Sequence, residues 1–236
     1  MRALLLCVLL RALASSRVVS KSHHYSSLLE SFIGKFINSE QAAQALLEEK
    51  PSAAQGGHEL VSVSIARHPS ATDVLVAAYS LGAFEDKAPP FRFRYYEFSP
   101  SSAEAAGEEE CGVVARMRLH RPLPQTELKL KEHSYDVSRY LPDLSTGFEH
   151  LQHCDVQWTH VGQSLSDCAA AYYHGTLVEG QCTVCSQADP SVRLLVRDDL
   201  RVFEDGLWIC DRAYTSSGRQ VIGHPDGVPY KLKKCR

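Results

Sequence analysis

Hydrophobic and polar positions follow a helical period at the start of the chain. In the stretch YSSLLESFIGKFIN (25–38) the apolar side chains recur every three or four residues, at Leu28, Leu29, Phe32, Ile33, Phe36 and Ile37. This spacing predicts an amphipathic helix with one buried face. The stretch SEQAAQALLEEK (39–50) predicts a second, shorter helix, with Ser39 as its cap and Pro51 after its end.

From residue 58 the pattern becomes that of short strands. Four segments rich in Val, Ile, Tyr and Phe alternate in part and are separated by Pro/Ser turns: 58–69, 72–81, 91–98 and 111–119. Seven further strand-like segments follow between residues 154 and 232. They predict antiparallel strands in sequence order. Residues 102–110, small and acidic, are expected to form a solvated loop, and residues 143–151 a short helix.

About ten short strands with almost no helix between them predict a single antiparallel β-barrel or curved sheet, although a sandwich fits the same pattern. The strand FRFRYYEF (91–98) bears on this choice. Arg92 and Arg94 share one face with Tyr96 and Phe98. A barrel interior that holds a polar ligand would accommodate the arginines. The alternative, which spacing alone favours, has the arginines in water and the opposite aromatic face in the core.

Composition and charge exclude some functions. The chain has 236 residues and a formal net charge of −3, which gives no electrostatic case for nucleic acid as a partner. We expect one domain over residues 22–236. The basic tail KLKKCR is expected to be a solvated end.

The first residues, MRALLLCVLLRALASS, are typical of a secretory signal peptide: Arg2, then an apolar run, then Ala12-Leu-Ala14. The run is too short to span a bilayer, and no other segment approaches transmembrane length. The front of a plastid presequence and a plain apolar helix are the alternatives. Residues 1–20 are therefore expected to direct the protein to the secretory pathway or a plastid, and the rest to be soluble, with no membrane partner.

The eight cysteines are Cys7, Cys111, Cys154, Cys168, Cys182, Cys185, Cys210 and Cys235. Loss of Cys7 with the leader would leave an odd number. Cys182-Thr-Val-Cys185 has metal-ligand spacing, but the sequence has no second CxxC or HxxxH pair to complete a metal site. We therefore expect disulfides or buried thiols and no metal. A thiol hydrolase built on Cys154 with His153 or His160 is disfavoured, because no third orienting group is evident.

Several stretches resemble, in their order and spacing, the CpcT/CpeT family of chromophore (phycobilin) lyases, from about Ser27 to Leu232. They are LLESFIGKFINSEQA, VLVAAYS, FRFR, HCDVQW, Cys182 and ICDRAYTSSGRQVIGHPDGVPYKL. The resemblance implies a calyx-like (lipocalin-like) antiparallel β-barrel with N-terminal helices packed on it, often dimeric. It also implies that the barrel binds an open-chain tetrapyrrole, a phycobilin, as substrate and attaches it to a cysteine of a phycobiliprotein subunit, with no further cofactor.

The chemistry of a bilin selects candidate residues. Its two propionates call for the planar fork of arginine, from Arg92, Arg94 or Arg212. Its pyrrole N–H groups call for a carboxylate, from Asp155 or Asp211, and its flat body for aromatic walls. Asp211 is also the candidate catalytic acid, although an ordinary ion pair or turn cap would equally explain Asp211-Arg212. The aromatic candidates are Tyr79, Tyr96 and Trp158, with Tyr214 either bonding nearby or lying in the core.

Addition of a client thiolate to the bilin needs a proton donor and positioning by the lyase, so its own cysteines are not required as nucleophiles. Cys154 and Cys182 are accordingly expected to be structural. The expected function is a bilin lyase. The alternative is a non-catalytic binding protein for a tetrapyrrole or another apolar acid, favoured by Val76-Ala77 where the family has Glu-Gln. A disulfide-stapled domain with a filled interior is third.

Overall fold

The computed structural model describes residues 22–86, 88–101, 112–133, 142–162, 171–185, 189 and 191–235. The expected targeting segment (1–20), the acidic loop (102–110) and three cysteines (Cys7, Cys111 and Cys168) lie outside these residues. In the part of the chain that is described, no helix is both long enough and apolar enough to cross a bilayer.

Residues 22–32 are helical, and sixteen further strands and α-helices follow. In chain order these are β1 Gly34–Ile37, α2 Ser39–Leu47, β2 Val61–His68, β3 Ala71–Leu81, β4 Arg92–Pro100, β5 Val113–Pro122, α3 Pro124–Glu132, α4 Leu144–Gly147, β6 Phe148–His150, β7 Val156–Val161, β8 Tyr172–Leu177, β9 Cys182–Cys185, β10 Arg193–Val202, β11 Gly206–Tyr214, β12 Gln220–Ile222 and β13 Tyr230–Lys234.

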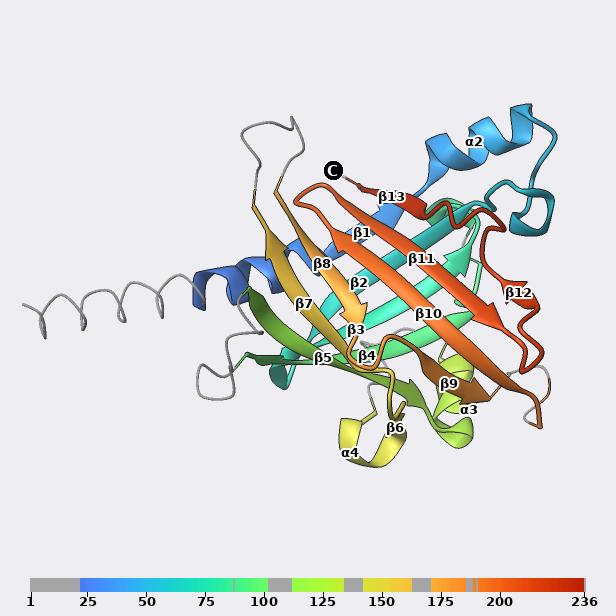
Figure 1. Ribbon diagram of the computed structural model, residues 1–236. Helices are drawn as coiled ribbons and strands as arrows, with labels where there is room; N and C mark the ends of the chain where they lie inside the picture. Colours follow the sequence, from blue (N-terminus) through green and yellow to red (C-terminus); the bar gives the residue numbers. More distant parts are fainter. Residues whose placement is uncertain are drawn as a thin grey trace, which may run out of the picture.

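The strands form an antiparallel sheet that closes on itself (Figure 1). Around the ring the order is β11-β13-β1-β2-β3-β4-β5-β7-β8-β10, and the pairing of β10 with β11 completes it. The closed barrel confirms the expected fold class. β9 and β12 extend the wall at one end, where they pair with the far parts of β10 and β11.

The opposite end of the barrel is filled by side chains. The helix of residues 22–32 lies at that end (Figure 1), and its Leu28, Leu29 and Phe32 are buried in the main hydrophobic core. The ring of Phe32 meets the fully buried indole of Trp158 edge-on, at 5.0 Å between centroids. Burial of this apolar face is what holds the N-terminal helix on the barrel.

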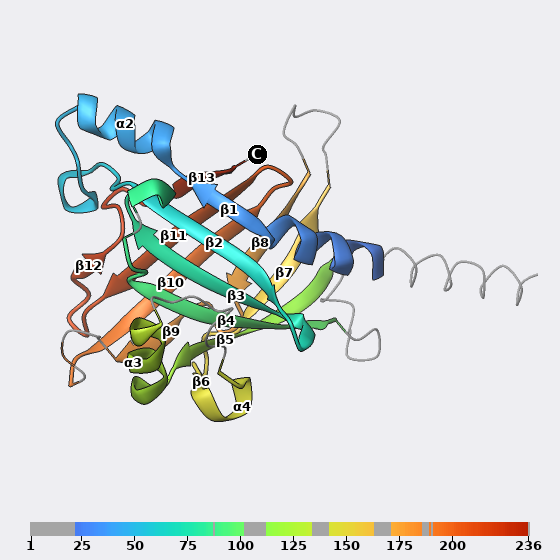
Figure 2. The ribbon, with the colours of Figure 1, turned by 180° about the vertical axis from the view of Figure 1, so that it is seen from behind.

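A second, smaller core lies outside the barrel. Phe93 and Tyr95 of β4 pack there with Leu130 of α3 and Phe148 of β6. Figure 2 shows α3 and α4 on this side of the barrel, next to β4 and β5. Because the aromatic face of β4 is covered from outside, its other face, with Arg92 and Arg94, must look into the barrel. The alternative that places the arginines in outer solvent is therefore wrong.

Some local predictions need correction. The predicted helix over 25–38 ends at residue 32, and Gly34–Ile37 form β1 instead, paired with β2 and β13. Gly34 has φ of +146°, a conformation that glycine favours and that interrupts the helix. Ser39 is the first residue of α2 rather than its cap. The cap position is Asn38, whose side chain binds the backbone of Glu59 and Val61.

Two further elements differ from expectation. Helix α3 was not predicted from the sequence, although Pro124 stands at its start, a position that suits proline. The helix expected over 143–151 is shorter, because α4 ends at Gly147 and residues 148–150 pair with β5 as β6.

Candidate functional site

The barrel interior changes from apolar to charged partway along several strands. On β10 the inward positions Leu200 and Val202 belong to the core, and the next inward position toward the β9 end is Asp198. On β4 Tyr96 and Phe98 belong to the core, and Arg94 and Arg92 follow them. The charged residues therefore form a layer across the barrel, at the floor of a cavity.

The cavity above this layer has a volume of about 320 Å³. Its apolar lining comes from Leu119, Leu151, Val184, Leu194, Val196 and Ile222. Its charged lining comes from Arg92, Arg94, Arg121, Asp198 and Asp211. An enclosure with apolar walls and a few convergent charged groups is the usual form of a small-molecule site.

An ion pair crosses the barrel at the floor. Arg92 on β4 donates from Nη1 to the Oδ2 atom of Asp211 on β11, at 2.9 Å. β4 and β11 stand on opposite sides of the ring, so this contact joins the two walls. Burial alone would lower the pKa of Arg92, but the carboxylate of Asp211 outweighs it and holds that pKa above its ordinary value. Arg92 is therefore a cation whose charge is already matched.

Asp198 stands directly opposite Asp211 in the register of β10 and β11. Its Oδ1 atom is buried and has no hydrogen-bond partner. Burial, and after it the neighbouring carboxylate of Asp211, raise the pKa of Asp198 well above its usual range. The pair thus places in the cavity a carboxyl group that holds its proton more tightly than an ordinary aspartate does.

Arg94 differs from Arg92 in having no matching carboxylate. Its Nη1 atom donates to the backbone carbonyl of Phe93 at 2.8 Å, and among the described residues no acidic side chain pairs with it. Burial, followed by repulsion from Arg92, lowers the pKa of Arg94 to about 10, so it remains protonated at neutral pH. Arg94 is a cation that faces the cavity without a counter-charge.

The remaining polar groups around the floor are satisfied. Arg121, on β5, forms an ion pair with Glu149 of β6. The hydroxyl groups of Tyr79 and Tyr96 bond to each other at 2.6 Å, and burial raises the pKa of both. The guanidinium carbon of Arg92 lies 5.7 Å from the centre of the Tyr79 ring. The two predicted aromatic residues therefore support the floor from below.

A disulfide bond forms part of the cavity wall. It joins Cys154, just before β7, to Cys182 on β9, with the Cα atoms 4.9 Å apart. Both cysteines are buried, whereas Cys185 is an exposed free thiol that also borders the cavity. Cys154 and Cys182 thus hold β9 against the barrel, and no group of His, Cys, Asp and Glu residues in the described ranges is arranged to hold a metal.

Six of the predicted site residues do not line the cavity: Tyr79 and Tyr96 lie beneath its floor, and four others lie elsewhere. Arg212 and Tyr214 alternate with Asp211 and Ala213 along β11 and therefore lie on the outer face. Trp158 is fully buried in the main core. Asp155 lies in the turn before β7, where its carboxylate binds His150 at 2.6 Å.

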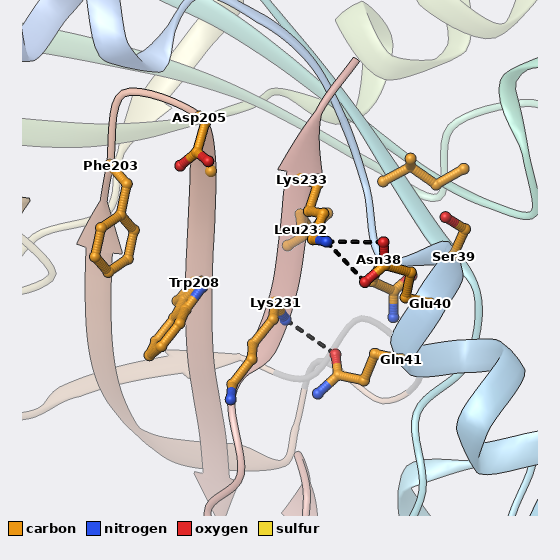
Figure 3. Close-up of a pocket in the computed structure, with 12 residues that line it drawn as sticks. Asn38, Ser39, Glu40, Gln41, Phe203, Asp205, Trp208, Lys231, Leu232 and Lys233 are labelled. Carbon is orange, nitrogen blue, oxygen red and sulfur yellow. Dashed lines mark hydrogen bonds and ion pairs between the residues drawn. The ribbon is translucent and has the colours of Figure 1, made fainter. Parts of the chain in front are cut away.

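A larger groove of about 460 Å³ lies on the outer surface, between α2 and the strands β11 and β13 (Figure 3). Phe203 and Trp208 form one side of it. In this groove Lys233 binds Glu40 at 2.7 Å, and the backbone amide of Lys231 donates to the side chain of Gln41 at 2.9 Å. The barrel cavity, where several charged side chains converge among apolar walls, is the better candidate site.

Sequence reasoning missed Asp198 and Arg121. The signal for Asp198 is present, because the inward positions of β10 read Leu194, Val196, Asp198, Leu200 and Val202, with one carboxylate in an apolar series. Arg121 ends a similar series on β5. Neither signal identifies a partner, since the partners lie on strands distant in the sequence.

Comparison with known proteins supports the fold alone. No protein-family model matches the chain, and no curated protein matches it. Among solved structures, the selenomethionine form of the CRL protein of Arabidopsis is similar, with a TM-score of 0.59 and 16% sequence identity. The similarity covers 91% of this chain and 99% of that chain. It extends over the barrel as a whole.

Proposed function

We propose that this barrel binds an apolar carboxylic acid in its cavity, with the ligand's carboxylate on Arg94. The observation that carries the proposal is the unmatched charge of Arg94 among apolar walls. Arg94 is half-buried, and a charge drawn away from water is costly unless it is paired; a ligand carboxylate would supply the pair through a charge-assisted hydrogen bond.

The resemblance to the CpcT/CpeT family supports an open-chain tetrapyrrole as the ligand. Such a molecule carries propionates for the arginine side and pyrrole N–H groups for the carboxyl oxygens of Asp198 and Asp211. The cavity volume of about 320 Å³ lies at the lower end of the range of roughly 300–1,000 Å³ for small-molecule sites. A tetrapyrrole would therefore enter in part and project through the mouth.

A second candidate function is transfer of that tetrapyrrole to a cysteine of a phycobiliprotein subunit. The observation that favours it is the acid at the floor, Asp198, whose pKa is raised by burial and by the neighbouring Asp211. The client thiol would lose its proton to solvent, and its sulfur would form the C–S bond with a double-bond carbon of the ligand. Asp198 would deliver the proton that the tetrapyrrole gains and then be reprotonated from solvent.

Co-expression with a bilin pathway and an apo-phycobiliprotein subunit tests both functions. Colour that stays on this protein and is lost on denaturation supports binding, and acid-stable colour on the subunit supports transfer. The variant Arg94→Ala should lose the colour, while Arg197→Ala, which removes an exposed outward arginine of β10, should keep it. Retention of a bilin by Arg94→Ala at the level of the unmodified chain would contradict the site assignment.

A further inference from the structure

Most of the positively charged side chains that line the cavity are already paired with a carboxylate. Of its three arginines, Arg92 is paired with Asp211 at 2.9 Å and Arg121 with Glu149. Among the described residues, Arg94 is left with the backbone carbonyl of Phe93 as its hydrogen-bond partner. The fifth charged side chain, Asp198, adds an acidic group with a buried, unpartnered oxygen. The described side chains therefore leave one guanidinium available to an incoming anion.

We propose, building on the function proposed above, that the cavity selects a ligand that brings one carboxylate to its floor and rejects a head group with two. One carboxylate can pair with Arg94. A second one on the same head would meet the carboxyl groups of Asp198 and Asp211, with Arg92 and Arg121 already engaged. Burial of an anion without a counter-charge is strongly unfavourable, whatever the ligand's apolar area.

The lining also sets the direction of the ligand. The charged groups lie next to the apolar core, and Val184, Leu194 and Ile222 lie farther toward the β9–β12 end. The acid head therefore lies at the floor and the apolar body points to the mouth. For a tetrapyrrole this means one propionate on Arg94 and the second one at the mouth, in water.

A matched pair of ligands tests the selection. Dodecanoic acid and decylmalonic acid have the same alkyl chain, and the second differs by one more carboxyl group on the carbon next to the head. Calorimetric titration of the purified chain, at a pH where all carboxyl groups of both ligands are ionised, measures the two affinities. We expect decylmalonate to bind at least about tenfold more weakly, a difference of about 1.4 kcal/mol.

A single substitution should relax the selection. Glu149→Gln removes the partner of Arg121, which neighbours Arg94 and repels it, and so provides a second free guanidinium. We expect this variant to gain about tenfold in affinity for decylmalonate relative to dodecanoate. The matched control is Glu127→Gln, which removes a carboxylate paired with Lys131 on helix α3, and its ligand preference should match that of the unmodified chain.

The outcomes of these titrations distinguish failure of the one-carboxylate rule from failure of the proposed binding function. If dodecanoate binds, Arg94→Ala abolishes its binding, and decylmalonate binds equally well, the one-carboxylate rule is wrong and the proposed function stands. If Glu149→Gln leaves the preference unchanged, the charge count that underlies the rule is wrong. If dodecanoate does not bind at all, the proposed binding of apolar acids fails, and the inference fails with it.

Discussion

Asp211 and Arg212 are adjacent in the sequence but act on opposite sides of the barrel wall. Consecutive residues of a strand point to opposite faces, so once Asp211 faces Arg92 across the interior, Arg212 must lie outside. The strand period therefore allowed at most one member of the pair to reach a ligand. At this scale the sequence identified Arg92, Arg94 and Asp211, which do meet, but gave no means of telling the matched arginine from the unmatched one.

The ion pair between Arg92 and Asp211 should give a measurable coupling energy in a double-mutant cycle. Arg92→Ala removes a charged hydrogen bond at 2.9 Å and leaves Asp211 beside Asp198, so it should cost about 1.5–3 kcal/mol in the free energy of unfolding. The double variant Arg92→Ala/Asp211→Ala should lose less than the sum of the two single losses, as measured by urea denaturation. The control is Lys233→Ala, which removes the exposed ion pair between Lys233 and Glu40. It should cost less than about 1 kcal/mol in the free energy of unfolding. Additive losses would contradict the coupling.

The raised pKa of Asp198 should appear in the pH dependence of stability. A carboxyl group that holds its proton more tightly in the folded state makes the protein less stable as the pH rises from the group's ordinary value toward its folded value. In Asp198→Asn this loss is absent. The variant should therefore gain in free energy of unfolding, relative to the unmodified chain, as the pH rises above about 4. Denaturation curves whose difference does not change with pH would show that Asp198 is not held protonated.

At the scale of elements, β4 shows what alternation predicts and what it leaves open. The period of two correctly divides its residues into an arginine face and an aromatic face. Which face is inside depends on α3 and β6, which cover Phe93 and Tyr95 from outside and whose packing no local pattern of β4 contains. For the same reason Phe36 and Ile37 fit a helical spacing in the sequence, while pairing with β2 and β13 places them in a strand.

The pairing of β7 with β8 depends on a glycine. Gly175 lies opposite Trp158, and a Cβ atom at this position would come within 2.7 Å of the indole ring. Gly175→Ala should cost about 1–3 kcal/mol in the free energy of unfolding, because the fully buried ring cannot move without disturbing the core. Gly162→Ala, just after β7 and with open space around it, is the control and should change stability by less than about 0.5 kcal/mol. Equal effects of the two substitutions in thermal or urea denaturation would argue against this packing.

At the scale of the molecule, the barrel has two different halves. One is filled by the core around Trp158 and Phe32, and the other contains the cavity, with the Cys154–Cys182 disulfide in its wall. The fold class was accessible from the sequence, since some ten alternating segments leave few arrangements. The division into halves was not, because it depends on where the N-terminal helix packs and which cysteines pair.

The disulfide should contribute mainly through the unfolded chain. It closes a loop with a sequence separation of 28, and removal of both cysteines, as Cys154→Ala/Cys182→Ala, should cost about 3 kcal/mol in the free energy of unfolding. Cys235→Ala, which removes an exposed free thiol, should stay within about 0.5 kcal/mol of the unmodified chain. Chemical denaturation of the three proteins measures these values. Equal midpoints for all three would contradict a structural role for the bridge.

Because the core fills one end of the barrel, the cavity opens only at the other end. A ligand that enters with its carboxylate first would have to dissociate through the same opening, with its apolar part first. A dye or bead coupled to the apolar part would lie outside the mouth of the cavity and leave binding intact. The same label coupled through the carboxyl group would abolish binding. If the proposed ligand binds in this way, its apolar part would be accessible to another macromolecule while its carboxylate is still bound at the floor.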